Sequence, residues 1–304
     1  MLLEKLRNRE SGIVLYGITP PKSASEPAKI EAIASKLFKR LEGVSVDGLV
    51  VYDIQDEAAR IAETRPFPYL ETVDPFWYCE GYLEALSIPK VIYRAVGKYQ
   101  ETQLQQFLQQ APPDKYLTVF VGAAAKAQRV TMSLPEAYRL RKRLDSPVTL
   151  GGVVIPERHK NKGDEHLRVF RKIESGCTFF VSQGVYDVNA AKNFLSEYFY
   201  YGQQHDIPLA PIIFTFTPCG STKTLQFMKW LGIDIPKWLE NDLRHSHDIL
   251  QSSIAFCEQN WRELQEFAAR KHIPIGCNIE SVAIRKAEIE ASIELLKRVL
   301  TSRT

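Results

Sequence analysis

The sequence lacks several features that mark other classes of protein. Its net charge is only +3 over 304 residues, and no block of basic residues stands out, so nothing favours a nucleic-acid partner. The stretch MLLEKLRNRE is charged and has no long apolar run. We therefore expect neither a signal peptide nor a membrane span, and a cytoplasmic protein. The 45% of hydrophobic residues is enough to bury a full core, which argues against disorder.

Cysteine and histidine patterns typical of disulfide scaffolds and metal centres are also missing. The five cysteines are odd in number, scattered, and form no C-x-x-C pair. We expect reduced thiols in or near the core, at Cys79, Cys177, Cys219, Cys257 and Cys277. His245 and His247 are two residues apart, a spacing that does not share a helix face. No serine or cysteine lies in a nucleophile elbow. The sequence therefore predicts no metal site and no hydrolase-type nucleophile.

The most informative stretch runs from residue 151 to residue 187. It covers most of one strand-like run, residues 148–155, and all of a second, residues 177–182, and each run is followed at once by polar residues. Between them, HLRVFRKIES alternates with helical period. A strand that ends in polar residues, a helix and another such strand indicate a βαβ unit with chemistry at the carboxyl ends of its strands.

The same alternation recurs along the whole chain. Strand-like runs occupy residues 13–18, 46–54, 90–96, 116–122, 148–155, 177–182, 209–218 and 273–281. A helical pattern follows each run, and a longer helical insertion, residues 236–271, precedes the last one. Residues 65–78, rich in proline and aromatic rings, indicate a long loop over one face of the fold.

This order of elements predicts an α/β fold, a single (β/α)8 TIM barrel with a helical insertion before the last strand. The runs are apolar on both faces, which suits a parallel sheet covered on both sides, and eight such units favour a closed barrel. We expect residues 1–304 to form one domain. A doubly wound open sheet is the alternative. It would normally carry a glycine-rich phosphate turn after the first strand, and TPPKS is not one.

Polar residues gather at the predicted strand ends, where barrels place their active sites. In chain order the residues at the strand ends are Gly17 and Thr19; Asp53, Gln55, Asp56 and Glu57; Arg94; Gly122; Glu157, Arg158 and His159; Gln183, Tyr186 and Asp187; Thr215 and Thr217; Asn278, Glu280 and Ser281. A mouth rich in carboxylates and hydrogen-bonding groups suits a flat heterocycle, because a carboxylate pairs well with an amino-pyrimidinone edge. Helix capping is the alternative role for Asp187, Ser133 and Ser221.

Several segments resemble motifs of the methylenetetrahydrofolate reductase family. SGCTFFVSQGVYDV resembles the family's AG-A-x3-ITQ-FFFD, and IPERH, residues 155–159, resembles its YPE-x-H. TPP, residues 19–21, resembles E-F-F-P-P, and residues 214–238 resemble the segment GIMPV…F…GV-IP-W. The resemblance runs from the first predicted strand to the last. It implies a (β/α)8 barrel, in agreement with the count of strands.

The chain departs from this pattern at two acids. The glutamate of E-F-F-P-P falls on Gly17, and the R-G-D after the fourth strand falls on residues 121–123, so that Ala123 replaces the aspartate. Gln183 of the folate site is kept. Arg171 and Lys172 match flavin-phosphate contacts of flavin-bearing members, but they are also ordinary residues for the end of a surface helix.

A flavin-independent type within this family is the most similar, at DIQDE (residues 53–57), PERHKNKGDEHLR, VYDVNAAKN and NIESVAIRKAEIEAS. The resemblance implies hydride transfer from NADH or NADPH to 5,10-methylenetetrahydrofolate, giving 5-methyltetrahydrofolate, without bound FAD. It places the protein in one-carbon metabolism and methionine biosynthesis, with a tetrahydrofolate as ligand. The alternatives are a flavin-bearing reductase and a non-catalytic folate-binding or partner subunit that works with another protein.

The reaction implied by the resemblance assigns roles to the strand-end residues. Opening the five-membered ring requires a proton on the departing nitrogen, hence a general acid. With no acid at Gly17, Glu57 is the first candidate and Glu280 the second. Gln183 would hold the pterin, with Asp53 or Glu280 on its amino group. The other expected substrate contacts are Gln55, Tyr186, Asn278 and Ser281. The expected contacts with nicotinamide phosphates, the folate tail or a flavin are Arg94, Glu157, Arg158, His159, Arg171 and Lys172.

Overall fold

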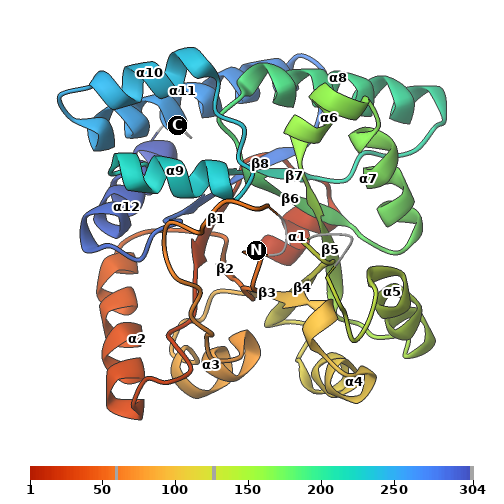
Figure 1. Ribbon diagram of the computed structural model, residues 1–304. Helices are drawn as coiled ribbons and strands as arrows, with labels where there is room; N and C mark the ends of the chain where they lie inside the picture. The colour runs from red at the N-terminus through yellow and green to blue at the C-terminus, as the bar shows by residue number, and fades with distance from the viewer. Residues whose placement is uncertain (59–60, 125–127, 302–304) are drawn as a thin grey trace.

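The strands close into a barrel. The computed structural model describes residues 1–58, 61–124 and 128–301, and within these ranges eight parallel strands pair in chain order, with β8 returning to β1. They are β1 (Ile13–Ile18), β2 (Gly48–Val51), β3 (Lys90–Ala95), β4 (Tyr116–Val121), β5 (Thr149–Val154), β6 (Phe179–Gly184), β7 (Ile212–Phe216) and β8 (Ile275–Glu280). Figure 1 shows them at the centre of a ring of helices. The predicted (β/α)8 barrel is confirmed.

Each strand is followed by a helix that packs on the outside of the barrel. These helices are α2 (Pro27–Leu41), α3 (Pro75–Tyr82), α4 (Glu101–Gln110), α5 (Leu134–Arg143), α7 (Glu165–Glu174), α8 (Val188–Gln204), α9 (Thr222–Trp230) and α12 (Lys286–Thr301). The short 3-10 helix η2 (Val96–Lys98) also follows β3. The predicted insertion before β8 consists of α10 (Lys237–His245) and α11 (Ile249–Ala269). None of the described helices has the length and apolarity needed to cross a membrane.

Two helices were not predicted. α1 (Leu2–Arg7) has only six residues, too few to show a hydrophobic period. α6 (Pro156–Lys162) replaces the expected polar break: proline stands in its first turn, and Gly163 ends it with a left-handed φ of 65°. The strand predicted at residues 46–54 is also shorter, because β2 pairs with its neighbours only as far as Val51.

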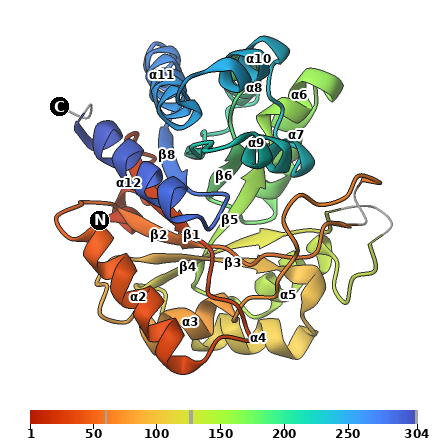
Figure 2. The same ribbon diagram turned by 60° about the vertical axis from the view of Figure 1, so that its left-hand side comes forward.

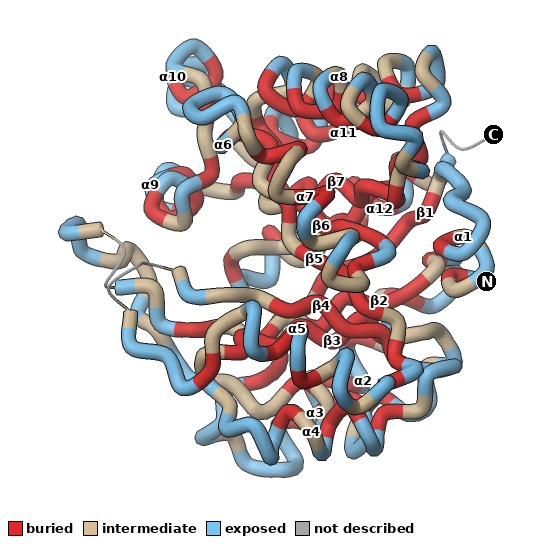
Figure 3. Tube along the Cα trace, turned by 90° about the vertical axis from the view of Figure 1, so that its right-hand side faces the viewer, coloured by how far each residue is buried: buried red, intermediate tan, exposed pale blue. Residues whose placement is uncertain are grey.

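The core has an inner and an outer part. The inner cluster fills the barrel with side chains from the strands, including Val50, Leu117 and Phe179, and α1 adds Leu2 and Leu6 at the amino-terminal end. The outer cluster lies between the sheet and the helices. Figure 3 shows buried residues concentrated on the strands and exposed ones on the outer helix faces. The five cysteines are all buried and free, as predicted.

Candidate functional site

A carboxyl group lies beside the position of the missing acid. Glu280, the last residue of β8, is the strand partner of Gly17 on β1. A Cβ atom at Gly17 would lie 2.9 Å from the ring of Tyr52 and 3.1 Å from Cβ of Glu280. The Tyr52 side chain therefore fills the space that an acid on β1 would need, while the neighbouring strand supplies a carboxyl group.

Glu280 is held by a short chain of hydrogen bonds. The side-chain amide of Asn278 donates to the hydroxyl oxygen of Tyr52 at 2.8 Å and to Oγ1 of Thr215 at 3.2 Å. The Tyr52 hydroxyl in turn donates to the Glu280 carboxylate. Burial raises the pKa of Glu280 to about 7, and the Tyr52 bond opposes that rise. A carboxyl group with this pKa exists in both protonation states near neutral pH and is able to donate a proton.

Gln183 lies at the carboxyl end of β6, where the pairing of β6 with β7 shifts register. Its side-chain nitrogen donates to the backbone carbonyl of Leu231, just after α9, at 2.7 Å. This bond fixes the orientation of the carboxamide in a half-buried position.

Asp53 and Arg94 belong to one ion-pair network. The carboxylate of Asp53 accepts from Nζ of Lys98 at 2.6 Å and from the hydroxyl of Tyr99 at 2.8 Å. The guanidinium of Arg94 pairs with Asp74 and donates to the Tyr99 hydroxyl at 3.0 Å. Both predicted site residues thus bind other side chains of the loops after β2 and β3, and their roles toward a ligand stay predictions.

Three further candidates form local bonds within the protein. The Gln55 amide donates to the carbonyl of Gly122 at 3.2 Å, joining the loops after β2 and β4. Tyr186 is buried, and its hydroxyl donates to the carbonyl of Thr217 at 2.7 Å. Ser281 donates to a backbone carbonyl two residues further on, at 2.6 Å. Their expected contacts with substrate also stay predictions.

The N-cap positions considered from the sequence are confirmed for all three residues. Asp187 accepts from a backbone N–H in the first turn of α8 at 3.0 Å, and Ser221 does the same for α9 at 3.1 Å. Ser133 occupies the N-cap position of α5 and donates to Glu136 in the first turn. Among the described residues, no group of three or more His, Cys, Asp or Glu side chains is arranged to hold a metal ion.

The residues after β5 are on α6. Arg158 is exposed, whereas the His159 ring packs edge-on against the ring of His166 at 5.4 Å. Glu157 is only 5% exposed, and its carboxyl oxygens meet no side-chain donor among the described residues. Burial raises the pKa of Glu157 to about 8, and the nearby carboxylates, such as that of Asp187, raise it further.

The free energy of unfolding of the parent is expected to fall as pH rises, because Glu157 is buried, and Glu157→Gln should remove this fall. Glu157 keeps its proton in the folded state up to about pH 8, against a reference pKa of 4.5. Between pH 4.5 and about pH 8 the folded protein therefore binds more protons than the unfolded chain. The free energy of unfolding falls over this range, by up to about 1.4 kcal/mol per pH unit. Urea unfolding at several pH values checks this. Parallel pH profiles for the variant and the parent would contradict it.

Arg171 and Lys172, which resemble flavin-phosphate contacts, lie in different surroundings. Arg171 is exposed in the last turn of α7. The ammonium group of Lys172 instead donates to the backbone carbonyl of Val153 on β5, and burial lowers its pKa. The lysine therefore points at the barrel wall and bonds with it.

A cover segment, residues 61–73, belongs to the connection between β2 and α3 and lies beside α9 (Figure 2). The guanidinium of Arg65 lies over the rings of Phe227, at 5.2 Å, and Trp230, at 4.9 Å. The Trp230 indole donates to the carbonyl of Glu63 at 2.9 Å. These contacts confirm the predicted loop over this face. Glu57, the other candidate acid, is half-buried in the loop that leads into the segment, and its charge acts on Arg65.

Arg65 is a candidate that sequence reasoning missed. Its Nε and Nη1 atoms are buried and have no hydrogen-bond partner in the described part of the chain. The one signal in the sequence was an arginine at the start of a proline- and aromatic-rich loop, and nothing in it indicated that α9 would supply the rings.

The fold and the strand-end residues define a (β/α)8 barrel protein with a half-buried acid at its carboxyl-terminal end. The family model for methylenetetrahydrofolate reductase matches residues 142–266. The solved structure of an uncharacterized protein from Clostridium thermocellum, which binds two copies of 5-methyl-5,6,7,8-tetrahydrofolic acid, is 49% identical over 99% of this chain and 100% of that one, with a TM-score of 0.89. The chain belongs to the methylenetetrahydrofolate reductase family.

Two further solved structures share little sequence with this chain. The dihydropteroate synthases of Vibrio fischeri and Xanthomonas albilineans are each 10% identical over 97% of this chain and 94% of theirs, with TM-scores of 0.48. No curated protein matches the chain.

Proposed function

We propose that the protein reduces 5,10-methylenetetrahydrofolate to 5-methyltetrahydrofolate with hydride taken directly from NADH or NADPH. The observation that carries the proposal is the pairing of Glu280 with Gly17, since it puts an acid beside the position where the family's own acid is missing. Family membership and the folate bound by the Clostridium thermocellum relative support the substrate class.

The reaction needs one proton and one hydride. Protonation of the departing ring nitrogen breaks its bond to the methylene carbon and leaves that carbon doubly bonded to the other nitrogen as an iminium ion. The hydride of the reduced nicotinamide adds to this carbon and forms the methyl group. In the proposed mechanism Glu280 supplies the proton, Tyr52 positions its carboxyl group, and Gln183 binds the pterin edge.

We propose that hydride passes directly from the nicotinamide to the folate, because the residues at the positions that bind flavin in flavin-bearing members do not fit a flavin. Lys172 donates to the Val153 carbonyl in the barrel wall, and Arg171 is exposed on the outside of α7. Ala123 has no carboxyl group to offer. These three residues favour a protein that binds the nicotinamide as a second substrate.

The assay uses the purified protein with methylenetetrahydrofolate and either NADH or NADPH. The proposal predicts formation of 5-methyltetrahydrofolate equal to the nicotinamide oxidised, by a protein without the visible absorption of a flavin. A non-catalytic folate-binding subunit is the second candidate, favoured by the loss of acids at Gly17 and Ala123. Folate binding without turnover with either nicotinamide would support it.

The pH profile of kcat is expected to have a limb set by Glu280. Because the acid must be protonated, activity falls as pH rises through about 7. The Tyr52 hydroxyl stabilises the carboxylate form, so Tyr52→Phe raises the pKa of Glu280 and moves the limb to higher pH. Steady-state rates across the pH range test this. A limb that stays in place in Tyr52→Phe assigns it to another group.

A further inference from the structure

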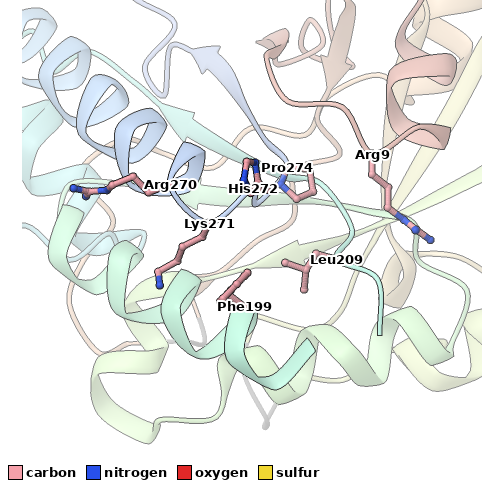
Figure 4. A pocket seen from close by; sticks show the side chains of 7 residues that line it. All are labelled: Arg9, Phe199, Leu209, Arg270, Lys271, His272 and Pro274. Atoms are coloured by element: carbon pink, nitrogen blue, oxygen red, sulfur yellow. The ribbon is translucent and has the colours of Figure 1, made fainter. Parts of the chain in front are cut away.

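The two ends of the barrel differ in how their polar side chains are arranged. The amino-terminal end has an open depression of about 550 Å³, lined mainly by residues that precede β1, β7 and β8. Figure 4 shows the charged ends of Arg9 and Lys271 pointing away from it to opposite sides, so they form no joint site. Inside the carboxyl-terminal end, by contrast, polar side chains of β7, β8 and the residue after β2 meet one another.

Asn278 of β8 is at the centre of these contacts. It is fully buried, and its amide nitrogen donates to the hydroxyl oxygen of Tyr52 at 2.8 Å and to Oγ1 of Thr215 at 3.2 Å. Its amide oxygen has no hydrogen-bond partner in the described part of the chain. Because a buried polar atom without a partner is costly, the two N–H groups are the part of this side chain that the position requires.

Thr215 anchors one side of the amide to the barrel wall. The backbone N–H of Thr215 donates to Oγ of Ser182 on β6 at 2.9 Å, and that hydroxyl donates to the carbonyl of Gln183 at 2.6 Å. These bonds lie where the pairing of β6 with β7 shifts register. The Asn278 amide is therefore held between the wall at Thr215 and the hydroxyl of Tyr52.

The N–H group of Asn278 decides where the Tyr52 hydroxyl proton points. A phenol has one O–H proton, and the same oxygen accepts through its lone pairs. Because Asn278 donates to this oxygen, the Tyr52 proton is directed to the other neighbour, Glu280. Tyr52 thus donates to one carboxyl oxygen of Glu280, whether or not the carboxyl group is ionised. The acidic proton of neutral Glu280 then lies on the second oxygen.

We propose that Asn278 is a positioning residue, which through Tyr52 keeps the acidic proton of Glu280 on the carboxyl oxygen that Tyr52 leaves free. The inference rests on the proposed function, in which this proton passes to the departing nitrogen of the folate. The O–H bond of Glu280 breaks, an N–H bond forms on the folate, and the Tyr52 bond is already in place for the carboxylate that remains. This indirect role replaces the direct contact with substrate predicted for Asn278, because its side chain is fully buried.

The surroundings of Glu280 make its titration a direct report on the Tyr52 bond. Burial and that bond are the causes that shift the pKa of Glu280. Among the described residues, its charge acts on three tyrosines, Tyr16, Tyr52 and Tyr93, and burial raises the pKa of each above its usual value. These phenols stay neutral around pH 7, where Glu280 titrates.

Carbon-13 NMR of the full chain with labelled glutamate side chains tests the proposal. The Glu280 signal is identified by its absence from Glu280→Gln. Without the N–H group of Asn278, the Tyr52 oxygen is free to accept from protonated Glu280, which stabilises the neutral acid. Asn278→Leu should therefore raise the pKa of Glu280 by about 0.5–1 pH unit, the contribution of one hydrogen bond. Asn241→Leu, which changes an exposed asparagine of α10, is the matched control and should leave it unchanged.

A double-mutant cycle separates this role from a purely structural one. In the Tyr52→Phe background there is no hydroxyl to direct, so Asn278→Leu should leave the Glu280 titration where Tyr52→Phe puts it. Asn278→Asp is a second variant of the parent's shape. It should also raise the pKa of Glu280, because the new carboxylate draws the Tyr52 proton to itself. An unchanged Glu280 titration in either folded variant, or equal shifts from Asn278→Leu with and without the Tyr52 hydroxyl, refutes the positioning role.

The reductase assay is read separately from the NMR titration. If the titrations behave as expected but the parent does not reduce methylenetetrahydrofolate, the positioning of the Glu280 proton stands and the proposed function fails. In an active parent, Asn278→Leu should move the pH limb of kcat together with the NMR titration and leave KM for the folate nearly unchanged. A rise in KM with an unmoved limb identifies a direct contact with substrate and overturns the proposal.

Discussion

Glu280→Gln is expected to lower kcat for reduction of methylenetetrahydrofolate by about 10²–10⁴, the usual contribution of a general acid. Glutamine keeps the shape of the side chain and its place beside Gly17 and Tyr52, but it has no acidic proton. Because ground-state binding depends on shape and hydrogen bonds, the affinity for 5-methyltetrahydrofolate should change little.

Two variants sharpen this test. Glu266→Gln changes an exposed glutamate of α11 and should leave kcat unchanged. Glu57→Gln changes the acid that the sequence put first, and we expect a smaller loss than from Glu280→Gln. If Glu280→Gln stays within about threefold of the parent while Glu57→Gln loses activity, the general acid is Glu57, since an acid contributes about 10²-fold or more.

Phe179→Ala is expected to lower the free energy of unfolding by about 3–5 kcal/mol. Phe179 is fully buried in the inner cluster of the barrel. A Cβ atom at Gly151 on β5 would lie 2.5 Å from its ring, so the ring fills the space that this glycine leaves open. Removing the ring leaves a cavity in closely packed surroundings. Urea unfolding of the parent and the variant measures the change.

A double-mutant cycle tests the same packing from the other side. Gly151→Ala alone should cost about 1–3 kcal/mol, because its methyl group collides with the ring of Phe179. In the Phe179→Ala background the collision is gone, so the same substitution should cost clearly less. Equal costs in the two backgrounds would mean that Gly151 and Phe179 do not pack as described.

The barrel was predictable because its signal is repeated. Each strand is apolar on both faces and each is followed by a helical pattern, so errors of a few residues at the ends, as at β2, do not change the count. α1 and α6 lacked that redundancy. α1 buries Leu2 and Leu6, a pair too short to show a period, and the polar composition of PERHKNK in α6 concealed a short helix.

The site was less predictable, because strand ends show where residues lie along the barrel but not which way they point. Neighbouring strand residues face opposite sides of a sheet. Tyr93 packs in the inner cluster, whereas Arg94, the next residue, pairs with Asp74 outside it. The pairing of Glu280 with Gly17 depends on the register with which β8 closes on β1, and no local pattern encodes that register.

The most direct measurement of direct hydride transfer is the fate of deuterium. The purified protein is mixed in ordinary water with methylenetetrahydrofolate and NADH or NADPH that carries deuterium on the transferred position of C4. The 5-methyltetrahydrofolate formed is then analysed by mass spectrometry. Our account predicts one deuterium in each new methyl group. A methyl group without deuterium, or folate that binds and is not reduced, would contradict it.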